Sequence, residues 1–287
     1  MYPPEFEYYQ ASSISEALSL LGEHSGAKVL AGGHSLIPAM NIRLADPGVL
    51  IDIGRISDLK GISTRNGSVR IGALTTHAMI AASDSTPQAL SEAAGKIGDP
   101  QVRNRGTIGG NIAHADPGSD LPTVLTALGA SIHTTSAAGE RTLAASDFFT
   151  GILETALNEG EIVTAIEVPA PAKGSGSAYA KLANPASRYA MVGVAATVTI
   201  ENGKCTAAGV AVGGLTPTAT RAVSVEAALV GETLNPDLIA EAAQAVQNDL
   251  GDDILEDIHA GAEYRKAMAA VFVKRALTAA MERTKAG

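Results

Sequence analysis

The segment Lys28-Val29-Leu30-Ala31-Gly32-Gly33-His34-Ser35 runs from a short apolar stretch into two adjacent glycines and a hydroxyl residue. Glycine has no Cβ and tolerates positive φ, so such a segment lets backbone N–H groups approach an anion closely. We expect a strand over 28–30, a helix over 35–44 and a second strand over 49–53. A helix N-terminus beside the glycines would suit a pyrophosphate. The order of these elements predicts an α/β unit at this end of the chain.

A second segment, Thr107-Ile108-Gly109-Gly110-Asn111, repeats the pairing of two glycines with a hydroxyl residue. Neither segment has the spacing of a G-x-G-x-x-G fingerprint or of a P-loop. The first could be a tight connection in which glycine relieves strain, and the second a β-turn with Asn111 as the turn residue. Two such segments in one chain favour a shared phosphate-rich ligand, such as a dinucleotide. Thr107 could then supply a hydroxyl, Gly109 and Gly110 backbone amides, and Asn111 a side-chain amide.

Residues 98–120 are dense in Gly, Asn, Asp and Pro, so we predict a long loop that is ordered around a ligand. Asp116, Ser119 and Asp120 are candidates to bind ligand hydroxyls, because a carboxylate accepts well from a ribityl or ribose OH. Alternatively, Ser119 or Asp120 caps the helix expected over 121–128, with Pro122 in its first turn. Both interpretations can hold together.

Composition limits the classes of function. The chain has 287 residues, 46% hydrophobic and only 3% aromatic, so a sizeable core must be built from Ala, Val, Ile and Leu. A net charge of -9 argues against a nucleic-acid partner. The single cysteine excludes an intrachain disulfide or a cysteine-ligated cluster, and the six histidines have no metal-ligand spacing. We expect no metal site, no signal peptide and no transmembrane segment, and therefore a cytoplasmic protein.

The sequence pattern changes from residue 56 onward. Strands are expected over 69–73, 130–135 and 162–168, and residues 169–176 form the best linker candidate. Asn-Gly joins strands expected over 192–200 and 205–212, a strong hairpin signal. Helices are expected over 236–250 and 262–284, so the last third is α+β. We predict domains 1–175, with subdomains of about 1–55 and 56–175, and 176–287.

The two glycine segments resemble the two FAD pyrophosphate loops of the flavoprotein subunits of molybdenum hydroxylases, the xanthine dehydrogenase group. Within that group, the medium subunits of aerobic carbon monoxide dehydrogenases are especially similar. The resemblance also includes residues 3–8, 113–122 and 257–265 and covers essentially the whole chain. It implies an α+β fold class: a two-subdomain α/β FAD-binding region, of the PCMH or vanillyl-alcohol-oxidase-like type, followed by a small α+β domain with an antiparallel sheet. The FAD would lie between them.

The resemblance also implies a set of cofactor-binding residues. One group would wrap the diphosphate and part of the adenosine: Val29, Leu30, Ala31, Gly32, Gly33, His34, Ser35 and Leu36. A second group would close the other side: Gly106, Thr107, Gly109, Gly110 and Asn111. Ser119 and Asp120 would meet the diphosphate–ribityl portion, and Val102 would form an apolar wall. Ile162, Val163 and Lys181 match positions lining the flavin, and Tyr189 matches an aromatic residue that approaches the isoalloxazine.

Two of these residues have an alternative interpretation. A cation at Lys181, near the pyrimidine end of the ring, would stabilise the anionic reduced flavin and raise its potential. The alternative is a solvated surface lysine. For Tyr189 the alternative is a tyrosine at the edge of the core.

The family implies a role in electron transfer and no catalytic residue in this chain. FAD would accept electrons from a [2Fe–2S] cluster on a small subunit, with the molybdenum cofactor on a large subunit, in a dimer of heterotrimers. It would pass them to a quinone, NAD or dioxygen. Besides a carbon monoxide dehydrogenase, the hydroxylase could act on an N-heterocycle, an aldehyde or an aromatic acyl-CoA. The rival classes are a stand-alone flavin oxidoreductase and a non-catalytic nucleotide-binding or assembly protein.

Overall fold

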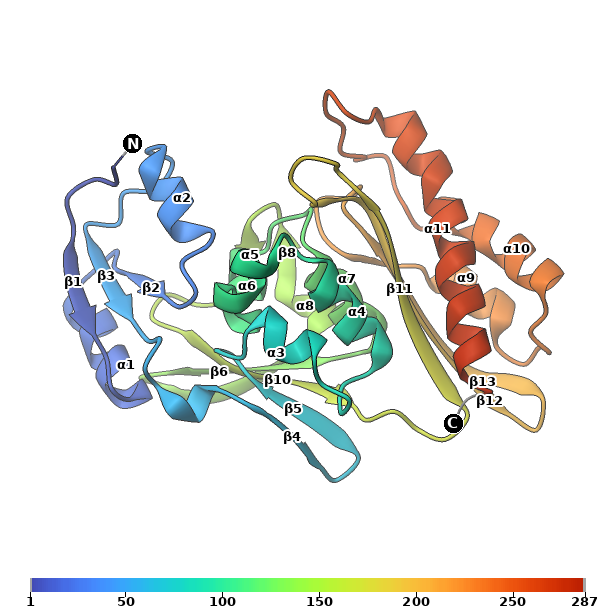
Figure 1. The fold of residues 1–287 in the computed structure, drawn as a ribbon, viewed down its shortest axis with the longest axis horizontal. Coiled ribbons are helices and arrows are strands. Elements are labelled where there is room, and N and C mark those ends of the chain that lie inside the picture. Colours follow the sequence, from blue (N-terminus) through green and yellow to red (C-terminus); the bar gives the residue numbers. More distant parts are fainter. Residues whose placement is uncertain (1, 286–287) are drawn as a thin grey trace.

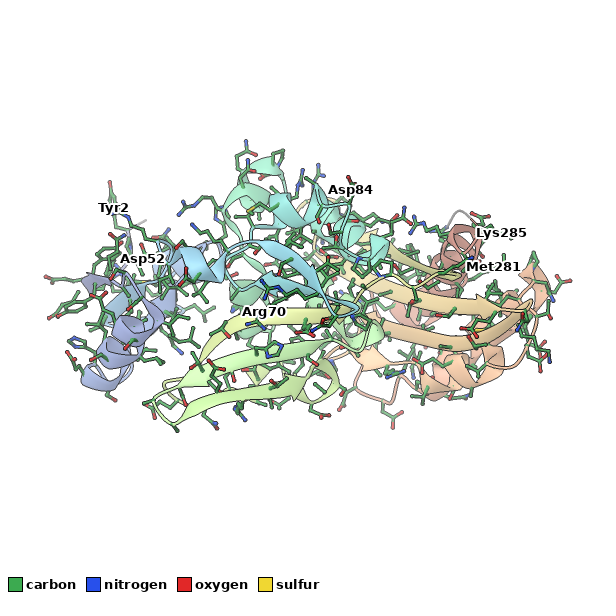
Figure 2. The ribbon with its side chains drawn as sticks, turned by 90° about the horizontal axis from the view of Figure 1, so that it is seen from below. Tyr2, Asp52, Arg70, Asp84, Met281 and Lys285 are labelled. Atoms are coloured by element: carbon green, nitrogen blue, oxygen red, sulfur yellow. The ribbon has the colours of Figure 1, made fainter. Side chains whose placement is uncertain are left out.

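The computed structural model describes residues 2–285, which form three parts along the long axis of the molecule (Figures 1 and 2). The first part is a parallel sheet of order β1-β3-β2 with two helices. Ser13 caps the first helix by accepting from the Glu16 N–H at 3.1 Å. The elements are β1 Glu7–Gln10, α1 Ile14–Glu23, β2 Lys28–Leu30, α2 Leu36–Asn41 and β3 Val49–Asp52.

The first part confirms the expected strand–loop–helix–strand order of β2, α2 and β3. The second helix is shorter than expected, because Arg43 adopts a left-handed backbone with φ 63° just after it. Strand β1 was not predicted. It pairs with β3, where Tyr8 lies opposite Leu50.

The middle part is an antiparallel five-stranded sheet of order β4-β5-β10-β6-β7 with helices packed against it (Figure 1). Its strands are β4 Ile62–Arg65, β5 Ser68–Gly72, β6 Ser131–Ser136, β7 Gly139–Ala144 and β10 Ile162–Pro169, with a small hairpin of β8 Phe149–Gly151 and β9 Glu154–Thr155. Its helical elements are η1 Ser57–Leu59, α3 His77–Ala81, α4 Gln88–Lys96, α5 Pro100–Arg105, α6 Ile108–His114, α7 Asp120–Ala127 and α8 Ala145–Phe148.

The prediction of one long loop over 98–120 is wrong, since this stretch contains helices α5 and α6. Asp99 caps α5 by accepting from the Val102 N–H at 2.9 Å. Thr107 caps α6, and a Cβ at Gly109 would lie 2.6 Å from the Ala73 Cβ. Glycine is therefore needed here because the helix packs closely on the strand end, not because the chain turns. Because residues 98–120 are mostly polar residues and glycine, their composition did not indicate the two short, capped helices that form there.

The last part is an antiparallel four-stranded sheet, with its own helices on one face and helices of the middle part on the other. The hairpin prediction is confirmed, with Asn202 and Gly203 both at positive φ in the turn. The predicted helix 236–250 ends earlier and continues as a 3₁₀ turn. The elements are β11 Ser175–Ala183, β12 Ala190–Glu201, β13 Lys204–Gly213, β14 Thr220–Arg221, α9 Val223–Leu229, α10 Pro236–Gln244, η2 Ala245–Asn248 and α11 Ala262–Arg283.

Each part has a hydrophobic cluster, and the middle one crosses into the last sheet. Tyr179, Ala195 and Ala211, all from the last sheet, are buried with Leu121 and Leu125 of α7. The middle and last parts therefore share a packed seam. The arrangement confirms the predicted α+β fold class; the residue boundaries of the domains stay a prediction.

Candidate functional site

The fold brings the two glycine segments into direct contact. A Cβ added at Gly32 would lie 2.2 Å from the carbonyl oxygen of Arg105, just before the second segment. A Cβ at Gly110 would lie 3.7 Å from the Ala31 Cβ. The His34 Nε2 is 3.3 Å from the Gln101 carbonyl oxygen. Two stretches far apart in the sequence therefore form one continuous surface.

The first segment offers a run of free backbone donors. Gly33 has φ +78°, a conformation that L side chains rarely adopt. Within residues 2–285, the N–H groups of residues 32–36 have no protein acceptor, whereas the next amide, Ile37, donates to the Gly33 carbonyl at 3.1 Å. Consecutive unpaired amides in a loop suit an anion with several oxygens, such as a diphosphate. The structure thus favours the ligand interpretation of this segment over simple strain relief.

The backbone amides of the second segment are less available to a ligand than its sequence suggests. The N–H of Gly109 donates to the Ala73 carbonyl at 2.8 Å, and that of Ile108 to Thr75 at 3.0 Å. Gly109 therefore supports the helix, and the expectation that its amide is open to a ligand is wrong. Among the described residues, the Gly110 amide donates only to the Thr107 hydroxyl, at 3.3 Å, and Gly110 is exposed. Gly110 is the glycine of this pair that a ligand can approach.

The start of α7 lies beside the second segment. The Ser119 hydroxyl donates to the Asn111 Oδ1 at 2.8 Å and does not cap α7. Asn111 therefore keeps its side-chain NH₂ without a protein acceptor among the described residues. Asp116 accepts from the Gly118 N–H at 2.8 Å, within its own loop. Thus Ser119 orients the Asn111 amide, and Asp116 shapes the loop.

Asp120 and Lys181 form a buried ion pair. Lys181 Nζ is 2.8 Å from Asp120 Oδ2, and the two side chains are 3% and 5% exposed. The Tyr179 hydroxyl donates to Asp120 Oδ1 at 2.5 Å. Burial raises the pKa of the Asp120 carboxyl, and the Lys181 ammonium and the Tyr179 hydroxyl oppose that shift. The alternative of a solvated surface lysine at 181 is therefore wrong.

Tyr189 is one of the residues that line an open pocket of about 400 Å³. It is 46% exposed, and its ring packs so close to Gly118 that a Cβ there would lie 2.9 Å from the ring. The pocket lies between the loop before α7 and the loop before α11, and Asp116, Tyr189 and Arg265 are among its lining residues. Burial raises the pKa of the Tyr189 phenol, with Asp116 and Asp120 adding to the shift.

The remaining candidate site residues pack against other parts of the protein. Ile162 and Val163 are 4% and 5% exposed and belong to the first and middle hydrophobic clusters. They start β10, whereas Lys181 lies on β11 of the other sheet. Val102, on α5, packs against Gly98. Among the described residues there is no group of three metal ligands, and no helix is long and apolar enough to cross a membrane.

Two family models match this chain and together span most of it. Residues 4–171 match the FAD binding domain in molybdopterin dehydrogenase, and residues 177–280 match the CO dehydrogenase flavoprotein C-terminal domain. The chain belongs to this family of molybdenum hydroxylase flavoproteins. It is an oxidoreductase subunit whose cofactor is FAD.

Two relatives match this chain over nearly their full length. The carbon monoxide dehydrogenase medium chain of Hydrogenophaga pseudoflava is 41% identical over 287 residues, 99% of both chains. The glyceraldehyde dehydrogenase medium chain of Sulfolobus acidocaldarius is 39% identical, over 96% of this chain and 98% of the relative. A solved structure of carbon monoxide dehydrogenase from H. pseudoflava, which lacks the Mo-pyranopterin moiety, superposes with a TM-score of 0.94 at 43% identity, covering 99% of each chain. These flavoproteins are named as chains of larger enzymes.

The site geometry fits FAD in this family member. Free amides at residues 32–36 suit its diphosphate, and the exposed Gly110 lies beside Ala31 at the junction of the two segments. Sequence reasoning missed Tyr179, which lies buried next to the ion pair. It also missed Lys96, whose Nζ donates to the Tyr179 carbonyl at 2.7 Å. No local motif marks either residue, since the residues that each of them contacts are distant in the sequence.

Proposed function

We propose that this chain holds FAD between its two glycine segments and transfers electrons within a molybdenum hydroxylase of the carbon monoxide dehydrogenase type. The run of free amides at residues 32–36, in the segment that contacts the second glycine segment, is the observation that carries the proposal. The bound FAD supplies the redox chemistry, and this chain supplies binding and electrostatics. The residues that hold it are those that the family resemblance indicates, from Val29 to Leu36 and from Gly106 to Asn111.

The partners in this proposal are a small [2Fe–2S] subunit and a large subunit with the molybdenum cofactor, in a dimer of heterotrimers. A single cysteine, Cys205, which is buried, agrees with a cluster located on another chain. The external acceptor is a quinone, NAD or dioxygen, and the cytoplasm is the proposed compartment.

A second candidate substrate class is an aldehyde. The glyceraldehyde dehydrogenase medium chain is nearly as similar to this chain as the carbon monoxide dehydrogenase medium chain. The substrate in such enzymes would be decided on the large subunit. Purified holoenzyme assayed with CO, an aldehyde and an N-heterocycle would separate these classes, because only one should reduce the flavin.

The experiment that tests the core proposal has two stages. The full chain should bind FAD in a 1:1 ratio after reconstitution, and the complex should co-purify with an iron–sulfur subunit. Mixing with that partner in its reduced form should bleach the flavin absorbance, whereas substrates added to the isolated chain should not. A colourless chain that takes up no FAD would overturn the proposal. Turnover by the isolated chain would favour a stand-alone oxidoreductase instead.

A further inference from the structure

The open pocket of about 400 Å³ that Tyr189 lines lies next to the second glycine segment. Pro117 and Gly118 form part of the pocket wall. The following residue, Ser119, donates its hydroxyl hydrogen to Asn111 Oδ1 of that segment at 2.8 Å. Since consecutive Cα atoms are about 3.8 Å apart, one short piece of backbone joins the pocket wall to the proposed FAD site.

The charges that line this pocket are mostly negative. Asp116, Glu256 and Asp257 are acidic, and Arg265 is the cation among the lining residues. Asp257 Oδ2 lies 2.6 Å from Arg265 Nη2, so these two charges are paired. Within residues 2–285, neither Asp116 nor Glu256 forms an ion pair. Arg188 belongs to the loop before Tyr189 but does not line the pocket. Two negative charges are left over, and they repel an anionic ligand.

The backbone around the pocket also offers little to an anion. The Gly118 N–H donates to the Asp116 carboxylate at 2.8 Å, and the Ala190 N–H donates to the Gly118 carbonyl at 3.0 Å. The Gly214 N–H donates to the Pro117 carbonyl at 3.0 Å. These amides are already used, unlike those of the first glycine segment. The pocket therefore lacks the run of free donors that suits a diphosphate.

Much of the remaining wall has an apolar surface. Tyr189 and Ile152 are 46% and 51% exposed, so both present surface to a ligand. Other apolar lining residues are Pro117, Met191 and Leu255. A volume of about 400 Å³ is within the usual range for small-molecule sites. An aromatic side chain in an apolar wall favours a flat ring without charge.

We propose that this pocket binds an uncharged ring acceptor of the quinone class, and that Asp116 and Glu256 disfavour anionic acceptors such as NAD. This inference rests on the proposed function and selects one of its acceptors. The quinone takes two electrons and one proton from the reduced flavin, which bears one negative charge, and a second proton from solvent. It leaves as a hydroquinone, and the flavin returns to its oxidised form.

Calorimetric titration of the FAD-loaded full chain tests the ligand class. The probes are 2-methyl-1,4-naphthoquinone, which is uncharged, and 1,4-naphthoquinone-2-sulfonate, which shares its ring system and has one negative charge. A sphere of this volume is about 9 Å across, and two unit charges at that distance in water weaken the binding of an anion about fivefold. The uncharged probe should bind saturably, and the sulfonate at least about fivefold more weakly.

The double variant Asp116→Asn/Glu256→Gln tests the source of this difference. Both changes remove a charge but keep an oxygen that accepts from the Gly118 and Ala262 amides. The sulfonate should bind about fivefold more tightly than to the wild type, and the affinity for the uncharged probe should stay within twofold. An unchanged ratio of the two dissociation constants would overturn the role of the two carboxylates.

Ile152→Asp tests the location of the site. It replaces apolar wall by a solvated carboxylate and should weaken the uncharged probe about fivefold, which corresponds to about half of the burial free energy of an isoleucine. Val230→Asp is the matched control, because Val230 is 47% exposed and does not line the pocket. In the assembled enzyme, Ile152→Asp should slow reoxidation of the flavin by low concentrations of the quinone about fivefold, whereas Val230→Asp should not.

Three results would overturn the inference. The uncharged probe fails to bind saturably, or the sulfonate binds as tightly as the uncharged probe. Alternatively, Ile152→Asp keeps the wild-type affinity and reoxidation rate, because the quinone then binds elsewhere. Failure of the proposed function has a different signature, a wild-type chain that takes up no FAD.

Discussion

Replacing Gly32 by alanine tests whether contact between the two glycine segments builds the FAD site. The added Cβ would lie 2.2 Å from the Arg105 carbonyl oxygen, 2.9 Å from its carbonyl carbon and 3.0 Å from the Gly106 Cα. These are backbone atoms, so no side chain can rotate away. Ordinary contact begins near 3.4 Å, and the two segments must therefore separate by about 1 Å.

The expected cost follows from this displacement. Forcing one extra methyl into a well-packed contact costs about 1–3 kcal/mol. If the FAD-bound state requires the segments in contact, the FAD dissociation constant should rise between about fivefold and 150-fold. The apo chain can relax by moving the first segment outward, so its unfolding should change less than its affinity for FAD.

The assay is titration of the apo chain with FAD, followed by flavin fluorescence. Gly22→Ala is the matched control, since a Cβ there meets nothing within 4 Å. It lies in α1, where alanine should raise stability by up to about 1 kcal/mol and leave FAD binding unchanged. Gly110→Ala should weaken FAD binding with little strain in the apo chain, because its Cβ meets only the Thr107 hydroxyl, at 3.0 Å, and the Ala31 Cβ. A Gly32→Ala dissociation constant within twofold of the wild type would refute the reasoning.

Three further predictions concern stability. Tyr179→Phe removes a donor from the buried Asp120 carboxylate and should lower the free energy of unfolding by about 1.5–3 kcal/mol, so an unchanged urea midpoint would contradict it. A hydrogen-bonded ion pair with Arg141 lowers the pKa of Glu161 to about 2, so its stabilisation is present above pH 4.5 and is lost as the pH falls towards 2. In Glu161→Gln, the free energy of unfolding should fall less between pH 5 and 2.5 than it does in the wild type. An equal fall in both proteins would contradict this prediction. Burial lowers the pKa of His77 from 6.5 to about 4. The unfolded chain therefore binds a proton at His77 more readily than the folded chain does, and the free energy of unfolding falls as the pH falls from about 6.5 to 4. In His77→Gln, the urea midpoint should therefore depend less on pH between 7 and 4, and an unaltered dependence would exclude that role.

Local signals in the sequence predicted much of the secondary structure correctly. The predicted strands over 28–30 and 162–168 are present, and Asn202-Gly203 forms the predicted hairpin turn. The failures lie where local composition misleads. The stretch from 98 to 120 looks like a loop, yet Asp99 and Thr107 each cap a short helix there. Such helices depend on packing against the sheet for their stability, which no local pattern reports.

The sequence by itself determined the two glycine segments, their hydroxyl neighbours and, by resemblance, the family and its cofactor. Only the tertiary structure decided which groups remain free for a ligand. Within residues 2–285, the amides of residues 32–36 have no protein acceptor, whereas the amide of Gly109 donates to the Ala73 carbonyl. Likewise, only the fold joins Lys181 to Asp120, 61 residues away, and Lys96 to the Tyr179 carbonyl. The reason is physical: backbone preferences act over a few residues, but burial and charge pairing depend on segments that meet only when the chain is folded.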